Sequence, residues 1–156
     1  NVAVVSAGVK SILDIGLTLE YLETKGIPVV TFKQEAFPSF YSSTSGYNSP
    51  LTLETPEAIA AMLKVKWDMG LNGSVLIANP VPSHQEIPVA EMEEHIVLAL
   101  DAAKRAGIKG KDITPFLLKY IANHTKGESL EANIALIKNN AALGAQIAVD
   151  LSAITD

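Results

Sequence analysis

The stretch Val2–Gly8, VAVVSAG, decides the fold. Its run of β-branched and small apolar residues predicts a buried strand, of the kind found in parallel sheets. Ser6-Ala7-Gly8 predicts a tight turn after the strand, and a helix is expected to follow, with Ser11 and Asp14 spaced as in a capping box. A strand that leads through a short turn into a helix is the first part of a parallel β-α-β unit. This stretch therefore predicts an α/β fold.

The rest of the chain continues this alternation of strand and helix. Apolar patterns and turn signals predict further strands at 27–32 and 74–78, loops at 34–55 and 79–88, and helices at 11–25, 55–70, 89–106, 114–126 and 129–151, the last capped by Ser129. Strands separated by helices require parallel, right-handed crossovers. The pattern therefore predicts a three-layer α/β/α architecture with a mostly parallel sheet.

Composition narrows the function classes. The 156 residues fit one domain, 1–156, and 48% apolar with 19% charged residues is typical of a globular protein. The absence of cysteine excludes disulfides, thiolate metal sites and a cysteine nucleophile, and suits a cytoplasmic protein. A net charge of −5 argues against nucleic acid as the main partner, and the apolar runs are too short to span a membrane.

The beginning of the chain predicts that more protein precedes it. Asn1 has no initiator methionine before it, and the first strand pattern starts at the very next residue. Three predicted strands also form a thin sheet for so many helices. We therefore expect the chain to be one piece of a longer protein, with more of the sheet upstream.

Lys10 is the first candidate for chemistry. It follows the first predicted strand, at the edge where α/β proteins bind ligands. A lysine there is a candidate nucleophile that forms a Schiff base with a sugar aldehyde. The structural alternative is an exposed lysine in a loop.

Several polar residues are weaker candidates. The hydroxyls of Ser42–Gly46 suit a phosphate or sugar, or simply a surface loop, and Asn79 either faces the crevice beside Lys10 or makes a local turn. On the last helix, Asn133 and Asn140 share a face seven residues apart and Asn139 adjoins them, which suits either a ligand or helix packing. Surface positions are expected for His84, His95, His124 and the acidic segment 91–94, none of which is spaced as a metal site.

Together these segments resemble the pseudouridine-5′-phosphate glycosidase family, also called the pseudouridylate synthase or indigoidine synthase A-like family. The resemblance is carried, in order along nearly the whole chain, by Val4–Asp14, Thr18–Thr24, Leu71–Gly73, Ala78–Pro80, Thr114–Leu118, Ser129–Asn133 and Asn139-Asn140. The family enzyme is considerably longer, so the chain resembles only the C-terminal half of its single glycosidase domain.

The resemblance implies a reaction and a role for two residues. Enzymes of this family reversibly cleave the C–C glycosidic bond of pseudouridine 5′-phosphate, which gives uracil and ribose 5-phosphate through a lysine Schiff base to the ring-opened ribose. Lys10 matches that lysine, and Asn133 matches a substrate-binding amide. The family's general-acid glutamate, a second lysine and the aspartate ligand of Mn²⁺ belong to the N-terminal half, so this chain has no metal ligand to assign. A homotrimer is also implied.

Two hypotheses remain open from the sequence. In the first, the chain is the lysine-bearing half of the glycosidase and depends on the N-terminal half for activity. The alternative is a non-catalytic binding or assembly module on the same α/β scaffold. The two differ in whether Lys10 is needed for function.

Overall fold

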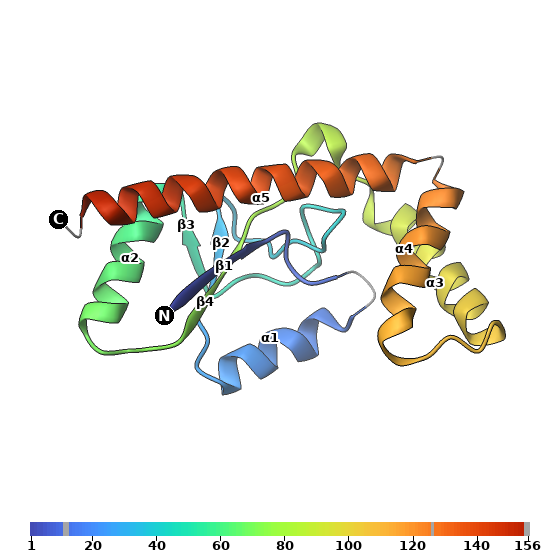
Figure 1. The fold of residues 1–156 in the computed structure, drawn as a ribbon, viewed down its shortest axis with the longest axis horizontal. Coiled ribbons are helices and arrows are strands. Elements are labelled where there is room, and N and C mark those ends of the chain that lie inside the picture. Colours follow the sequence, from blue (N-terminus) through green and yellow to red (C-terminus); the bar gives the residue numbers. More distant parts are fainter. Residues whose placement is uncertain (11–12, 126, 155–156) are drawn as a thin grey trace.

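The computed structural model describes residues 1–10, 13–125 and 127–154 of the chain (Figure 1). The strands are β1 (Val2–Ser6), β2 (Val29–Phe32), β3 (Leu51–Leu53) and β4 (Ser74–Ala78). The helices are α1 (Ile15–Thr24), α2 (Pro56–Asp68), α3 (Val89–Arg105), α4 (Ile113–His124) and α5 (Glu128–Ala153), with short 3₁₀ turns η1 (Ser83–Gln85) and η2 (Gly110–Asp112). None of these helices is long and apolar enough to cross a membrane.

The strands form one parallel sheet in the order β1-β4-β2-β3. The predicted parallel α/β fold is confirmed, but the predicted count of three strands is wrong. The fourth strand, β3, lies inside the predicted loop 34–55 and pairs with β2, Thr31 lying opposite Thr52. Three residues are too few to show a strand periodicity, so β3 depends on its neighbour in the sheet rather than on its own sequence.

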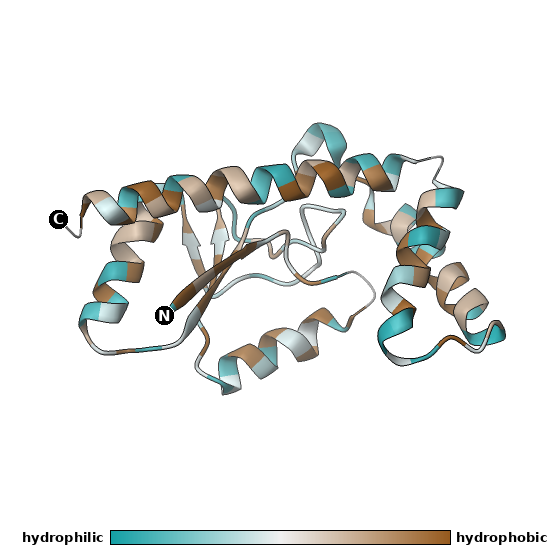
Figure 2. Cartoon of the chain, in the orientation of Figure 1, coloured by the Kyte–Doolittle hydropathy of each residue, from teal (hydrophilic) through white to brown (hydrophobic). Residues whose placement is uncertain are grey.

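Helices cover the sheet from both sides, as the three-layer prediction requires (Figures 1 and 2). Side chains alternate along β4, so Val75 and Ile77 pack against α2 and α5 while Leu76 and Ala78 pack with the α1 side. The core of the α2/α5 face also includes the fully buried Val30, Ile59 and Leu63. Because β1 and β4 pair in parallel, their carboxyl ends lie at one common edge of the sheet.

Helices α3 and α4 form a second packed unit beyond that edge (Figure 1). Met92, Ile96 and Ala99 of α3 pack with Leu117 and Ile121 of α4 in one apolar cluster. The same cluster includes Tyr41 from the loop after β2 and Ala132 from α5. Because α5 runs from α2 at one end to α4 at the other, it connects this unit to the sheet.

Helices α1 and α2 begin at a side-chain cap, whereas α3, α4 and α5 begin without one. At α2, Thr55 accepts from the Ala58 N–H at 3.2 Å, as predicted. At α1, the Asp14 carboxylate accepts from the Leu17 N–H and the helix begins at Ile15. The other member of the predicted capping box, Ser11, lies outside the described residues. Ser129 was predicted as a cap but lies buried inside α5, where its hydroxyl accepts a hydrogen bond from Thr125.

Candidate functional site

Lys10 lies just beyond the carboxyl end of β1, as predicted. The adjoining end of β4 is held beside it, because the Asn79 N–H donates to the Ser6 carbonyl at 2.7 Å. The Lys10 side chain is exposed and, among the described residues, makes no ion pair. Its amine is therefore presented at the edge of the sheet where α/β proteins bind ligands.

The turn between β1 and Lys10 is fixed by close packing against the loop after β2. Gly8 has φ +85°, and a Cβ atom at this position would lie 2.0 Å from the Pro38 carbonyl oxygen. The Phe40 N–H donates to the Ala7 carbonyl at 2.9 Å, while Phe40 itself adopts the left-handed conformation with φ 67°. Left-handed backbone is costly for a bulky residue, so the surrounding contacts must hold it there. The backbone that precedes Lys10 is thus positioned by a second loop.

Apolar side chains surround a small cavity of about 30 Å³ beside Lys10. The cavity lies between the loop after β2, which supplies Phe40 and Tyr41 in an edge-to-face pair, and α4, which supplies Leu117 and Leu118. The α3–α4 unit therefore forms one side of the candidate site.

Tyr41, at the junction of this cavity and the α3–α4 cluster, is 2% exposed. Burial raises the pKa of its phenol to about 12, since a buried phenolate would lose its hydration. The phenol is consequently neutral at any physiological pH.

The raised pKa of Tyr41 predicts a loss of stability in alkali. Between pH 10.0 and about 12 the unfolded chain releases this proton and the native chain retains it. The free energy of unfolding should therefore be unaffected below pH 10 and fall by on the order of 2 kcal/mol as the pH rises through that interval. Urea unfolding at several pH values, with Tyr41→Phe as the comparison, measures this. An equal alkaline slope in both proteins would contradict it.

Asn79 is buried and ties α5 to the sheet, a role that differs from both sequence interpretations. Its side-chain amide donates to the Asn140 oxygen at 3.2 Å instead of facing a crevice or making a local turn. One residue earlier on α5, the Asn139 amide donates to the Pro80 carbonyl at 3.0 Å. Two adjacent asparagines in an otherwise good helix are thus explained by their bonds to the end of β4.

These bonds also determine where α5 places Asn133. Asn133, Leu136 and Asn140 share one face of the helix at spacings of three and four residues. Asn140 bonds to the end of β4, and Leu136 packs with Ala7 after β1. Asn133 therefore lies one turn further out, at the same edge as Lys10. It is half-buried, and its amide makes no hydrogen bond to the described residues.

Removing the Asn79 amide should destabilise the chain. Asn79→Ala leaves the amide of Asn140 without its partner at a site where Asn79 itself is only 4% exposed, and we expect a loss of about 1–3 kcal/mol in the free energy of unfolding by urea. The exposed Asn123→Ala on α4 is the matched control, with an expected change within about 0.5 kcal/mol. Equal effects of the two substitutions would show that the bond does not stabilise α5 on the sheet.

The serine hydroxyls of the loop Ser42–Gly46 are engaged in hydrogen bonds to other segments of the chain. Ser43 donates to the Glu86 carboxylate from both its N–H and its hydroxyl, each at 2.8 Å. The Ser42 hydroxyl donates to the Ile87 carbonyl, and the Ser45 hydroxyl to the Phe37 carbonyl. These contacts favour the structural interpretation over a phosphate site, and Glu86, a partner distant in sequence, gave no signal in the sequence.

A metal centre finds no support in the described part of the chain, which brings together no group of three His, Cys, Asp or Glu side chains. His124 stacks on Tyr120 with ring centroids 3.9 Å apart, and His84 lies in η1. His95 lies on α3, where its Nδ1 is buried without a hydrogen-bond partner among those residues. The three histidines are therefore on separate elements.

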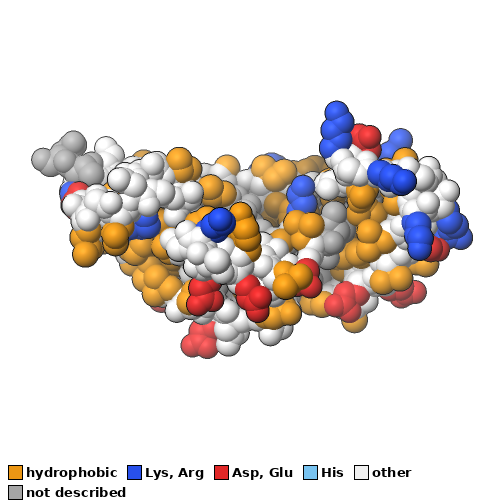
Figure 3. Space-filling model, turned by 90° about the horizontal axis from the view of Figure 1, so that it is seen from below, with side chains coloured by type: hydrophobic (Ala, Val, Ile, Leu, Met, Phe, Trp, Pro, Cys, Tyr) orange, Lys and Arg blue, Asp and Glu red, His pale blue; other side chains and the backbone are white. Residues whose placement is uncertain are grey.

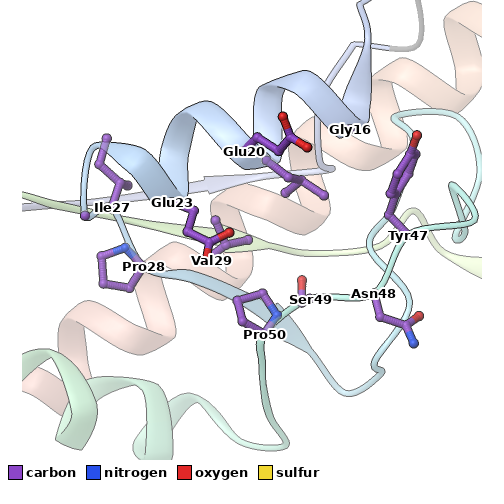
Figure 4. Close-up of a pocket in the computed structure, with 12 residues that line it drawn as sticks. Gly16, Glu20, Glu23, Ile27, Pro28, Val29, Tyr47, Asn48, Ser49 and Pro50 are labelled. Carbon is purple, nitrogen blue, oxygen red and sulfur yellow. The ribbon is translucent and has the colours of Figure 1, made fainter.

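A larger groove of about 640 Å³ runs along α1, away from Lys10 (Figure 4). It is lined by Glu20 and Glu23 of α1, by Pro28 and the first residue of β2, Val29, and by the segment Tyr47–Pro50 before β3. None of the candidate residues at the carboxyl ends of the strands lines it.

The chain is similar to several known proteins. Residues 1–150 match the family described as Indigoidine synthase A like protein. The chain is 59% identical over 150 residues to the pseudouridine-5′-phosphate glycosidase of Deinococcus radiodurans. This match covers 96% of this chain and 48% of the Deinococcus protein. The corresponding glycosidase of Petrotoga mobilis is 51% identical over 152 residues, covering 97% of this chain and 50% of that protein.

Solved structures agree with this result. The crystal structure of an indigoidine synthase A-like protein from Thermotoga maritima has a TM-score of 0.85 and 38% identity, covering 96% of this chain and 49% of that one. The structure of the prealnumycin C-glycosynthase in complex with ribulose 5-phosphate has a TM-score of 0.89 and 29% identity, covering 99% and 51%. The chain therefore spans about half the length of the relatives that it matches.

Proposed function

The chain belongs to the indigoidine synthase A-like family, and we propose that it is the lysine-bearing part of a pseudouridine-5′-phosphate glycosidase. The observation that carries the proposal is the position of Lys10 at the carboxyl end of β1, on a turn fixed by Gly8 and Phe40. The names of the curated relatives support the substrate. A structural relative that holds ribulose 5-phosphate supports a sugar phosphate as the ligand.

The proposed reaction begins at C1′ of the ribose. The Lys10 amine forms a bond to C1′ while the ring C1′–O4′ bond breaks and O4′ takes up a proton. The nitrogen lone pair then forms a C=N bond as the C1′–C5 bond to the base breaks, and the electron pair moves to C5 of uracil, which is protonated. Water hydrolyses the imine, which returns the amine and releases ribose 5-phosphate. A C–C glycoside has no leaving heteroatom, so an amine is better suited than a pair of carboxylates.

The site residues have distinct proposed roles. Lys10 is the nucleophile, and Asn133, whose amide is not engaged by the described residues, binds the substrate. The apolar wall of α4 limits water at the imine until uracil has formed. The position of Asn133 one turn beyond the contact between Leu136 and Ala7 supports these roles.

The general-acid glutamate, the second lysine and the aspartate ligand of Mn²⁺ that the family resemblance implies are assigned to the part of the relatives that the chain does not match. The described residues do not fit a Mn²⁺ site, so no step above uses a metal, and the Mn²⁺ that the family resemblance implies would be held outside this chain. We extend the proposal to a homotrimeric, cytoplasmic enzyme that contains both halves.

A chimera tests the proposed function. In it, the matched 150 residues of the Deinococcus radiodurans glycosidase are replaced by those of this chain, which are 59% identical. Release of uracil from pseudouridine 5′-phosphate by the chimera, at a rate comparable with that of the Deinococcus enzyme, is the expected result. A folded chimera without this activity would contradict the proposal.

A further inference from the structure

Glu86, between η1 and α3, has a carboxylate that is bonded to a segment far from it in the sequence. Its Oε1 atom accepts hydrogen bonds from the N–H and from the hydroxyl of Ser43, each at 2.8 Å. Glu86 is half-buried and makes no ion pair with the described residues. Seen from the α1 side, a group of Lys and Arg side chains gathers instead at the α3–α4 end of the molecule (Figure 3). The charge of Glu86 is therefore stabilised by the two Ser43 donors and not by a cation.

Further hydrogen bonds join the same two segments. The Ser42 hydroxyl donates to the Ile87 carbonyl, and the Ile87 N–H donates to the Tyr41 carbonyl at 2.9 Å. The segment before α3 is itself fixed to α5, because the Asn139 amide donates to the Pro80 carbonyl at 3.0 Å. This segment therefore holds three consecutive residues of the loop after β2 from a fixed position.

The opposite side of this loop holds the backbone before Lys10. Gly8 pairs with Ser39 in an antiparallel bridge, two residues before Lys10. The Ser39 N–H also donates to the Ser42 carbonyl at 3.0 Å, which joins the two sides of the loop. Contacts therefore run without a gap from the Glu86 carboxylate to the turn that presents the amine.

We infer that Glu86 is a positioning residue for Lys10: its carboxylate holds the loop 39–43 in the shape that fixes the turn before the amine. This inference rests on the proposed function, because it takes Lys10 as the nucleophile. A displacement of about 1 Å at a reacting group lowers a rate by up to about a hundredfold. Loosening the loop should therefore slow the reaction of the amine with C1′ and leave binding of the substrate largely unchanged.

Substitutions of Glu86 in the chimera test the inference. Glu86→Ala removes the acceptor of both Ser43 bonds, and we expect kcat for uracil release to fall by at least about tenfold, with KM changed by less than about twofold. Glu86→Gln keeps a carbonyl oxygen that accepts the same two bonds, so it should retain at least about half of the parent kcat. The control is Glu94→Ala, at an exposed glutamate of α3, which should leave kcat unchanged.

Either of two results with these variants would overturn the inference. A folded Glu86→Ala variant as active as Glu94→Ala would leave Glu86 with a role in stability alone. A Glu86→Gln variant that loses as much kcat as Glu86→Ala would show that the charge, and not the pair of hydrogen bonds, is required. If Glu86→Ala does not fold, the milder Ser43→Ala decides, because it removes one of the two donors. Its kcat should fall by about threefold or more, and a parent kcat would overturn the inference.

Hydrogen exchange resolved to single amides provides a readout that does not need activity. The Phe40 N–H, which donates to the Ala7 carbonyl, should exchange at least about fivefold faster in the Glu86→Ala chimera than in the parent. The Asn79 N–H, at the end of β4, should exchange equally in both. Equal exchange of the Phe40 amide would overturn the inference. An inactive parent chimera would contradict the proposed function, and exchange at Phe40 would still decide whether Glu86 holds the turn before Lys10.

Discussion

Replacing Lys10 with arginine is expected to reduce uracil release by the chimera by at least about a thousandfold. Arginine preserves the positive charge and much of the side-chain length, so binding of the phosphate-bearing substrate should change little. The guanidinium does not lose its proton in proteins and cannot form the C=N bond that the proposed reaction requires. The loss should therefore appear in kcat rather than in KM.

Lys109→Arg is the matched control, because Lys109 is an exposed lysine just before η2 and does not line the cavity beside Lys10. Its activity should equal that of the parent chimera. If Lys10→Arg retained a similar activity, Lys10 would not be the nucleophile. The chain would then fit the alternative of a binding or assembly module better.

Replacing Gly8 with alanine is expected to lower the free energy of unfolding more than the same substitution at any other glycine in the described chain. The added Cβ atom would lie 2.0 Å from the Pro38 carbonyl oxygen, and this partner is backbone that cannot rotate away. The left-handed φ of +85° adds strain for any residue with a side chain. We expect the free energy of unfolding to fall by about 4 kcal/mol or more.

Gly26→Ala separates the two causes of this loss. Gly26 also has a positive φ, of +64°, but a Cβ atom there would meet nothing within 4 Å. Its substitution should cost only about 1 kcal/mol, from backbone conformation alone. Urea unfolding of both variants measures the difference. A Gly8→Ala variant no less stable than Gly26→Ala would mean that the turn before Lys10 is not held by the Pro38 contact.

Local signals were sufficient for most of the fold. The apolar runs at β1 and β4 and the Thr55-Pro56 start of α2 are each contained within a few residues, and the structure confirms them. The sequence analysis failed where the decisive partner is distant. The strand β3 exists through pairing with β2, and Ser129 is buried by its contact with Thr125 instead of acting as a cap.

At the candidate site, too, local signals were sufficient for some residues and contacts between distant residues decided the others. The strand pattern before Lys10 predicted that this residue would lie at the carboxyl ends of the strands, and the structure places it there. The roles of the asparagines needed contacts that span 59 and 61 residues, from Asn139 to Pro80 and from Asn79 to Asn140. The contact of Gly8 with Pro38 is likewise determined by packing between loops, for which a single sequence has no periodic signal.

Covalent trapping tests the central claim most directly. The chimera is incubated with ribose 5-phosphate, reduced with borohydride to fix any imine as a stable amine, digested, and mapped by mass spectrometry. The account predicts one sugar-phosphate adduct, on the peptide that contains Lys10, and its loss in Lys10→Arg. An adduct on a different lysine, or an unchanged yield in Lys10→Arg, would contradict it.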